Sequence, residues 1–277
     1  MKSIIILVIG FIILFCCCHE DDLLKKNDQL VPLTLFADTT SHVLSRYGVP
    51  LPDAGNIQKI GLIICNFKNQ PYRGKSEYIG VKATLENGKW ITDTPIQLNS
   101  EIATIYAYYP DTLNLTDLKA IPVNSRNMDL LLAKCTGINN LNPDAVLKMY
   151  HAFARVKLRM FYMGYDTGYQ TATFVAISNV NQASNFGTSG TLDIFSGNLE
   201  ATGLNAKSFL DPGKKYELYD FPDPENYMEM LVFPAKFSGN EIKITVRFIK
   251  QTTSAFVLDA GEWLPGTVNK YTLIVNP

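Results

Sequence analysis

The nine residues 241–249 read EIKITVRFI, and their side chains alternate between apolar and polar along most of the stretch. Successive side chains of a β-strand point to opposite faces, so a period of two predicts a strand with one face in a core and the other in water. This stretch decides the fold class because the same pattern recurs through most of the chain. The face predicted to be buried carries Ile242, Ile244, Val246 and Phe248.

Other segments share this alternation or form short apolar runs bounded by turn residues. Gly, Asn and Pro separate these segments, and the pair Asn87-Gly88 suits the positive φ angles of a type I′ hairpin turn. Short strands at regular spacing are typical of β-sandwiches, so the sequence predicts an all-β fold. The clearest further strands are expected at residues 30–37, 57–67, 101–110, 172–180 and 270–275.

The chain has 277 residues, of which 47% are hydrophobic. Because a typical domain has roughly 100–200 residues, this length fits two sandwiches of similar size, each with its own core. We place their boundary near Asn142-Pro143. The predicted organisation is a signal peptide at 1–17, a tether at 18–29, an N-terminal sandwich at 30–142 and a C-terminal sandwich at 143–277.

The first segment is predicted to be an export signal. Lys2 gives it a positive start, and residues 4–15 form an apolar run of twelve residues. A membrane-spanning helix needs about 20 apolar residues, so this run suits the core of a signal peptide, with an uncleaved anchor as the alternative. Three cysteines, residues 16–18, follow where small residues would usually mark the cleavage site, and acidic residues come soon after them. The arrangement resembles a bacterial lipoprotein signal.

That resemblance implies that one cysteine becomes the first mature residue and carries acyl chains on its sulfur. We predict Cys18, because acidic residues follow it at positions 20–22, with Cys17 as the competing position. Cys65 and Cys135 are the two cysteines outside the signal. Both lie in apolar stretches and are predicted to be small core residues, and whether they pair in a disulfide is left open.

Charge and motifs argue against nucleic-acid binding and catalysis. Acidic and basic residues nearly balance, with a net charge of −1, so the chain carries no basic footprint for nucleic acid. None of the short metal, nucleotide or hydrolase motifs occurs, so we predict no enzyme, no cofactor and no metal site. The remaining candidates are interpreted as structural: His151 at a strand end, Trp90 and Trp263 as packing anchors, and Arg155, Lys157 and Arg159 as a solvated strand face.

Several stretches, taken in order, resemble segments of the fimbrillin-like family, the type V pilus subunits of Gram-negative anaerobes. They span most of the mature chain, and the lipoprotein signal precedes them. The similar stretches are IGLIICNF (60–67), NGKW (87–90), IYAYYP (105–110), NMDLLLAK (127–134), YHAFARVKLRM (150–160), GTLDIFSGNLEA (190–201) and WLPGTVNKYTLIV (263–275).

The resemblance implies two tandem sandwiches of transthyretin-like, Greek-key topology and a structural or adhesive role at the cell surface. It also implies an assembly mechanism. An arginine-specific protease removes the N-terminal strand of an exported lipoprotein, and a strand from a neighbouring subunit fills the vacated groove.

On this chain the removable strand would be residues 30–37. Pro32 has no backbone N–H to donate, which independently favours a sheet edge for this strand. Arg46, in the loop that follows, is the candidate cleavage site, with an ordinary surface arginine as the alternative. The removable edge strand would bury Val31, Leu33 and Leu35.

Two classes of function therefore stand side by side. The first is a structural or adhesive subunit of a fimbria, whose partners are other subunits, the outer membrane through the lipid, and a host or bacterial surface ligand. The second is a surface lipoprotein that binds a glycan or a host protein without polymerising. Both place the protein at the outer membrane on the cell surface, lipid-anchored at least as a precursor, and neither involves nucleic acid.

Overall fold

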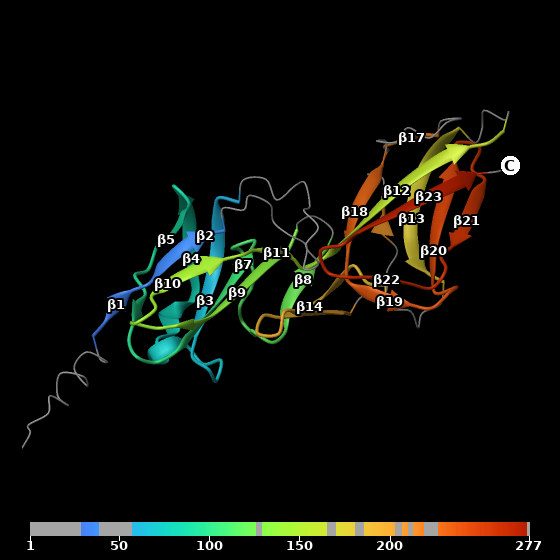
Figure 1. The fold of residues 1–277 in the computed structure, drawn as a ribbon. Helices are drawn as coiled ribbons and strands as arrows, with labels where there is room; N and C mark the ends of the chain where they lie inside the picture. The colour runs from blue at the N-terminus through green and yellow to red at the C-terminus, as the bar shows by residue number, and fades with distance from the viewer. Residues whose placement is uncertain are drawn as a thin grey trace, which may run out of the picture.

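The computed structural model describes residues 29–38, 57–125, 129–164, 170–180, 186–202, 207–209, 213–218 and 227–275 (Figure 1). Within these ranges the regular structure consists of β-strands and two 3₁₀ turns, η1 (Tyr72–Gly74) and η2 (Ser76–Tyr78). The all-β prediction is confirmed. The described part contains no helix long and apolar enough to cross a membrane.

The largest sheet has eight strands in the order β10-β2-β5-β4-β3-β7-β9-β11. At its β4–β5 hairpin, Asn87 and Gly88 have φ angles of 48° and 79°, as the type I′ turn requires. The strands are β2 (Thr34–Ala37), β3 (Lys59–Cys65), β4 (Ile79–Glu86), β5 (Lys89–Thr92), β7 (Ala103–Tyr109), β9 (Leu131–Ile138), β10 (Asp144–Leu147) and β11 (Tyr150–His151). A short pair, β1 (Val31–Pro32) and β6 (Gln97–Leu98), stands beside it.

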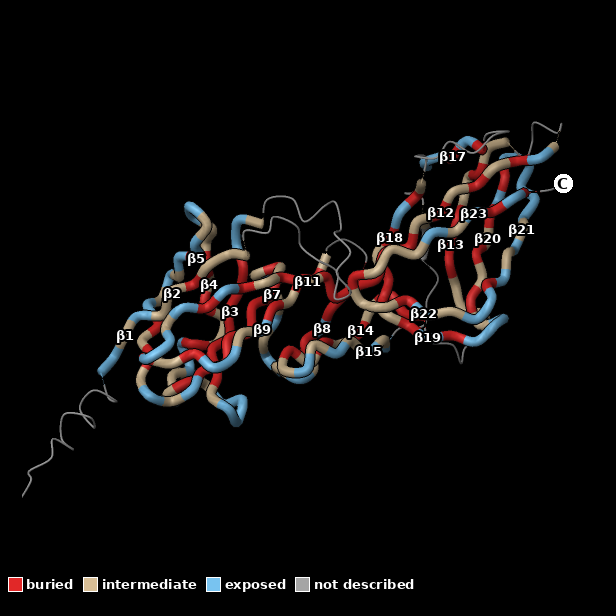
Figure 2. Tube along the Cα trace, in the orientation of Figure 1, coloured by how far each residue is buried: buried red, intermediate tan, exposed pale blue. Residues whose placement is uncertain are grey.

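Both faces of this sheet are covered, which is why β3 is apolar at nearly every position. Ile60, Leu62 and Ile64 of β3 point into one core, which we call the inner core and which also contains Leu35, Trp90, Ala145 and Leu147. Ile63 and Cys65 point to the opposite face. Figure 2 shows the buried residues concentrated along these strands.

The opposite face is covered by a three-stranded sheet, β15-β14-β8. Its strands are β8 (Ile121–Asn124), β14 (Ser189–Asp193) and β15 (Asn198–Ala201). Leu192 pairs with Ile121 across it, although the two residues are far apart in sequence. The hairpin 189–201 from the second half of the chain therefore packs onto the first sheet.

A separate core lies between the remaining sheets. One has the order β18-β12-β23 and the other β16-β13-β20-β21, with β17 on β13 and the pair β19-β22 nearby. The predicted strand 241–249 is β20, and its four predicted core residues are all buried. The bounds are β12 (Ala154–Tyr162), β13 (Thr171–Asn179), β16 (Lys207–Ser208), β17 (Tyr216–Glu217), β18 (Met228–Val232), β19 (Ala235–Phe237), β20 (Ile242–Phe248), β21 (Thr253–Val257), β22 (Gly261–Trp263) and β23 (Val268–Val275).

The expected boundary at Asn142-Pro143 does not coincide with a change of sheet. β10 pairs in parallel with β2, and β11 pairs with β9, so residues 144–151 complete the first sheet. The change of core comes later, between Phe153 and Ala154. Pro143 ends a tight turn between β9 and β10. It therefore marks a local turn and does not mark a division between two cores.

Cys65 and Cys135 are free and cannot pair in this fold. Cys65 lies beside Thr104 on β7, and Cys135 lies beside Ile105 on the same strand, so two strand spacings separate them. That separation is roughly 10 Å, and a disulfide tolerates a Cα distance of about 7 Å at most. The two thiols also point to opposite faces of the sheet. Burial raises the pKa of the Cys65 thiol to about 11.

Candidate functional site

The predicted removable strand, residues 30–37, is divided between two sheets. β1 pairs with β6, whereas β2 lies between β10 and β5. The prediction of an edge strand is therefore wrong for β2, which has a neighbour on each side. Pro32 lacks an N–H only at its own position in β1. The chain changes partners at Leu33, so the proline does not keep β2 at the edge of its sheet.

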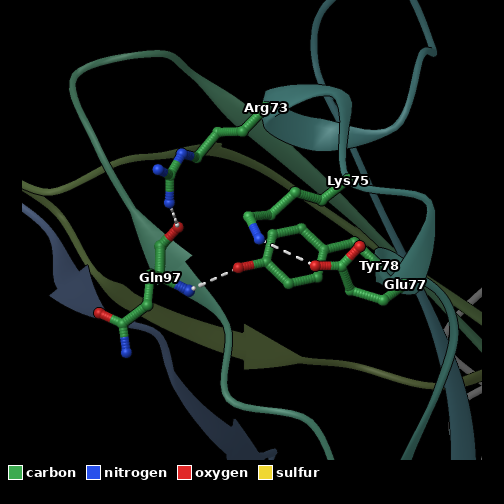
Figure 3. A network of polar contacts seen from close by, with 5 residues as sticks. All are labelled: Arg73, Lys75, Glu77, Tyr78 and Gln97. Atoms are coloured by element: carbon green, nitrogen blue, oxygen red, sulfur yellow. Dashed lines mark hydrogen bonds and ion pairs between the residues drawn. The ribbon is translucent and has the colours of Figure 1, made fainter.

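The strand opposite Pro32 satisfies its backbone through side chains (Figure 3). Gln97 is the register partner of Pro32. Its N–H donates to the Tyr78 hydroxyl at 3.0 Å, and its carbonyl accepts from Arg73 Nη1 at 3.4 Å. Nearby, Lys75 and Glu77 form a surface ion pair at 2.9 Å, and this hydrogen bond lowers the pKa of the Glu77 carboxyl. The side chains of Arg73 and Tyr78 thus satisfy the backbone polar groups of Gln97.

Backbone hydrogen bonds tie residues 33–38 to three neighbouring segments. β10 supplies four register partners to β2, whereas β5 supplies one, Lys89 opposite Phe36. The additional N–H to carbonyl bonds run from Leu33 to Ile96 (2.9 Å), Thr34 to Pro143 (3.0 Å), Ala37 to Gly88 (3.0 Å) and Asp38 to Leu147 (3.3 Å). Removal of this segment would leave a slot whose two walls, β5 and β10, both carry unpaired backbone groups.

The three predicted side chains fill this slot unequally. Leu35 is 2% exposed and lies in the inner core. Leu33 is partly buried and packs against the same core. Val31 is half-buried and is not among the described residues that pack there. The slot is thus anchored chiefly by Leu35. Cys17, Cys18 and Arg46 lie outside the described residues.

A second feature is a cavity of about 350 Å³ between the first sheet and the β14–β15 turn. Tyr106, Tyr150, Phe195 and Lys134 line it. The Phe195 ring meets the Tyr106 ring edge-on at 5.3 Å, and Lys134 Nζ lies 5.2 Å from the Tyr106 ring centre. Burial is the chief reason why the pKa of Tyr106 is raised. The lining combines aromatic rings with a cation and exposed polar groups.

His151 also borders this cavity, at the end of β11. Its side chain is fully buried, and its Nδ1 lies 2.5 Å from Asp129 Oδ2. Its Nε2 has no hydrogen-bond partner in the described part of the chain. The Asp129–His151 contact holds β11 against the segment that precedes β9. Among the described residues no cluster of side chains could hold a metal ion.

The two tryptophans are packing anchors, as predicted. Trp90 is 5% exposed in the inner core, and Trp263 is 1% exposed in the core of the second half. The cavity residues were not predicted. They come from β7, β9, β11 and the β14–β15 turn. In the sequence each of these residues looks like an ordinary strand or turn residue, so no sequence signal marks them.

The family model described as fimbrillin-like matches residues 54–277. The chain belongs to the fimbrillin-like family. No curated protein matches it by sequence. The fimbrillin-like assignment agrees with the non-enzymatic, structural character predicted above, and it indicates a cell-surface protein of fimbrial or adhesin type.

Solved structures share the fimbrillin-like fold of this chain. A candidate cell adhesion protein from Bacteroides uniformis has a TM-score of 0.62 at 18% identity, covering 89% of this chain and 94% of its own. A candidate cell adhesion protein from Bacteroides ovatus gives 0.56 at 14% identity, covering 89% and 92%. A fimbrial protein from Bacteroides vulgatus gives 0.51 at 11% identity, covering 90% and 95%. At these identities the likeness concerns the fold.

Proposed function

We propose that this fimbrillin-like chain is a structural and adhesive subunit of a type V pilus that assembles by strand exchange. It is exported as a lipoprotein acylated at Cys18, with Cys17 as the competing position, and it is cleaved after Arg46. Its partners are other pilus subunits, and its precursor is held at the outer membrane by its lipid.

One observation carries this proposal, namely the place of β2 between β5 and β10 with Leu35 in the inner core. Burial of a leucine side chain contributes about 1.5–3 kcal/mol. An emptied slot also exposes backbone groups on both walls, so a strand inserted there gains hydrogen bonds on two sides. Because Arg46 follows β2 in the chain, cleavage there breaks the covalent link between β2 and the rest of the fold. Non-covalent contacts alone then hold β2 in place.

The proposal predicts one cleavage product. An arginine-specific protease acting on the purified precursor should produce a new N-terminus at Tyr47, read by N-terminal sequencing, followed by a ladder of oligomers on denaturing gels. The Arg46→Ala variant should resist this cleavage and remain monomeric. Failure to find Tyr47 as a new N-terminus, or cleavage that yields only stable monomers, would contradict strand exchange.

The cavity favours a second candidate function, a non-polymerising surface lipoprotein that binds a glycan. Aromatic rings and polar groups around a cavity of this size suit a saccharide. On this view the Tyr150→Ala variant should lose about tenfold or more in affinity on a glycan array, because a ring of the lining is removed. Phe67→Ala is the control, since Phe67 is 75% exposed and is not among the residues that line the cavity. Equal binding by both variants would count against this function.

A further inference from the structure

The outer face of the sheet β18-β12-β23 gathers positive charge. On β12 the side chains of Arg155, Lys157 and Arg159 share this face. Across the ladder to β23, Lys157 is paired with Lys270 and Arg159 with Thr272. On the other side, Lys157 is paired with Glu229 of β18. Register partners point to the same face, so in the described part of the chain four cations and one carboxylate lie together on it. We call this set the basic face.

The one carboxylate is fully engaged by two of the cations. Glu229 Oε2 lies 3.2 Å from Arg155 Nη1, and its Oε1 contacts Lys157 Nζ. The side chains of Arg155 and Lys157 are only 8% and 18% exposed. The prediction of a solvated strand face is therefore wrong for these two residues. They are mostly buried and both contact Glu229, and water screens such buried ion pairs weakly.

The other two cations have no carboxylate within 4 Å in the part of the chain that the structure describes. Arg159 Nε donates to Thr272 Oγ1 at 2.9 Å. Its guanidinium lies 5.3 Å from the Tyr227 ring centre, and Lys270 Nζ lies 5.6 Å from the same centre. Lys270 also stands directly opposite Lys157. Like charges in register on adjacent strands destabilise a sheet, and within the described residues no ion pair compensates the charge of Lys270.

We propose that the basic face binds an anionic polysaccharide. The two cations that do not pair with Glu229, Arg159 and Lys270, lie on adjacent strands beside the Tyr227 ring. A polymer with repeated sulfate or carboxylate groups can contact both of them, and once the first contact has formed the second no longer requires a separate binding event. Thr272 and the Tyr227 ring stand beside the cations and offer a hydroxyl and an aromatic surface to sugar rings.

The test uses the purified protein and heparin as the probe, with affinity measured by titration calorimetry. The Arg159→Gln/Lys270→Gln double variant leaves the Glu229 ion pairs intact, and its affinity should fall about tenfold or more, because two charge-assisted contacts are lost. The matched control is Lys243→Gln/Arg247→Gln on β20, which removes the same charge from the other sheet. The control should change affinity by less than about threefold.

Three outcomes would overturn the proposal. They are the absence of heparin binding by the unaltered protein, an equal loss in both double variants, and binding to phosphatidylglycerol vesicles without binding to heparin. The last outcome would assign the face to a membrane surface. Thermal unfolding of both variants checks that the fold is kept. None of these measurements depends on cleavage at Arg46 or on polymerisation.

Discussion

The Leu35→Asp variant should lose about 4 kcal/mol or more of its free energy of unfolding. Leu35 is 2% exposed, and its register partner on β10, Ala145, is fully buried. A carboxylate at this position would be buried without a counter-charge, or protonated at a comparable cost. The measurement is urea unfolding followed by circular dichroism and extrapolated to water.

Val31→Asp provides the matched control, since it places the same charge on the same segment. Val31 is half-buried and lies outside the inner core, so its loss should stay below about 1 kcal/mol. If Leu35→Asp does not fold, Leu35→Ala should still show a loss of about 2–5 kcal/mol. Similar losses for Leu35→Asp and Val31→Asp would mean that Leu35 does not anchor β2 in its slot.

The Trp263→Ala variant should lose about 3–5 kcal/mol of its free energy of unfolding. The substitution removes a large ring from the core between the β18-β12-β23 and β16-β13-β20-β21 sheets. Trp263 is 1% exposed, and its ring meets the Phe237 ring at 4.9 Å and the Phe186 ring at 6.0 Å. Its Nε1–H donates to the Tyr271 hydroxyl at 2.9 Å. The same urea titration measures this loss.

Tyr271→Phe separates packing from hydrogen bonding at this position. It removes the acceptor hydroxyl and keeps both rings, so it should cost about 1–3 kcal/mol as the buried indole N–H loses its partner. A loss for Tyr271→Phe as large as that for Trp263→Ala would show that the hydrogen bond, and not the aromatic packing, dominates. A loss below about 1 kcal/mol for Trp263→Ala would contradict the packing role.

The strands themselves could be predicted from the sequence, whereas their neighbours, apart from the β4–β5 hairpin, could not. Alternation in β20 specifies which side chains face the core, and Asn87-Gly88 specifies the hairpin that joins β4 to β5. A period of two carries no information on which strand lies alongside. Thr34 therefore gave no sign that it would pair with Asp144, and a proline at 143 suggested a boundary inside the first sheet.

The candidate sites show the same limit. Leu35 was predicted as a core residue because the alternation within residues 30–37 places it on the apolar face. The strands on either side of it, β5 and β10, are distant in sequence and could not be predicted. The basic residues of β12 could be seen in the sequence, whereas their excess charge depends on Lys270 and Glu229 from two other strands. In each case the missing information was the pairing of strands distant in sequence.

The parallel pairing of β12 and β23 has a mechanical consequence. Eight consecutive register pairs join them, from Arg155 opposite Val268 to Tyr162 opposite Val275. A pull between the start of β12 and the end of β23 acts at opposite ends of this ladder and along its strands. Such a load shears all eight pairs together instead of breaking them one at a time, so the protein would resist extension through these two points.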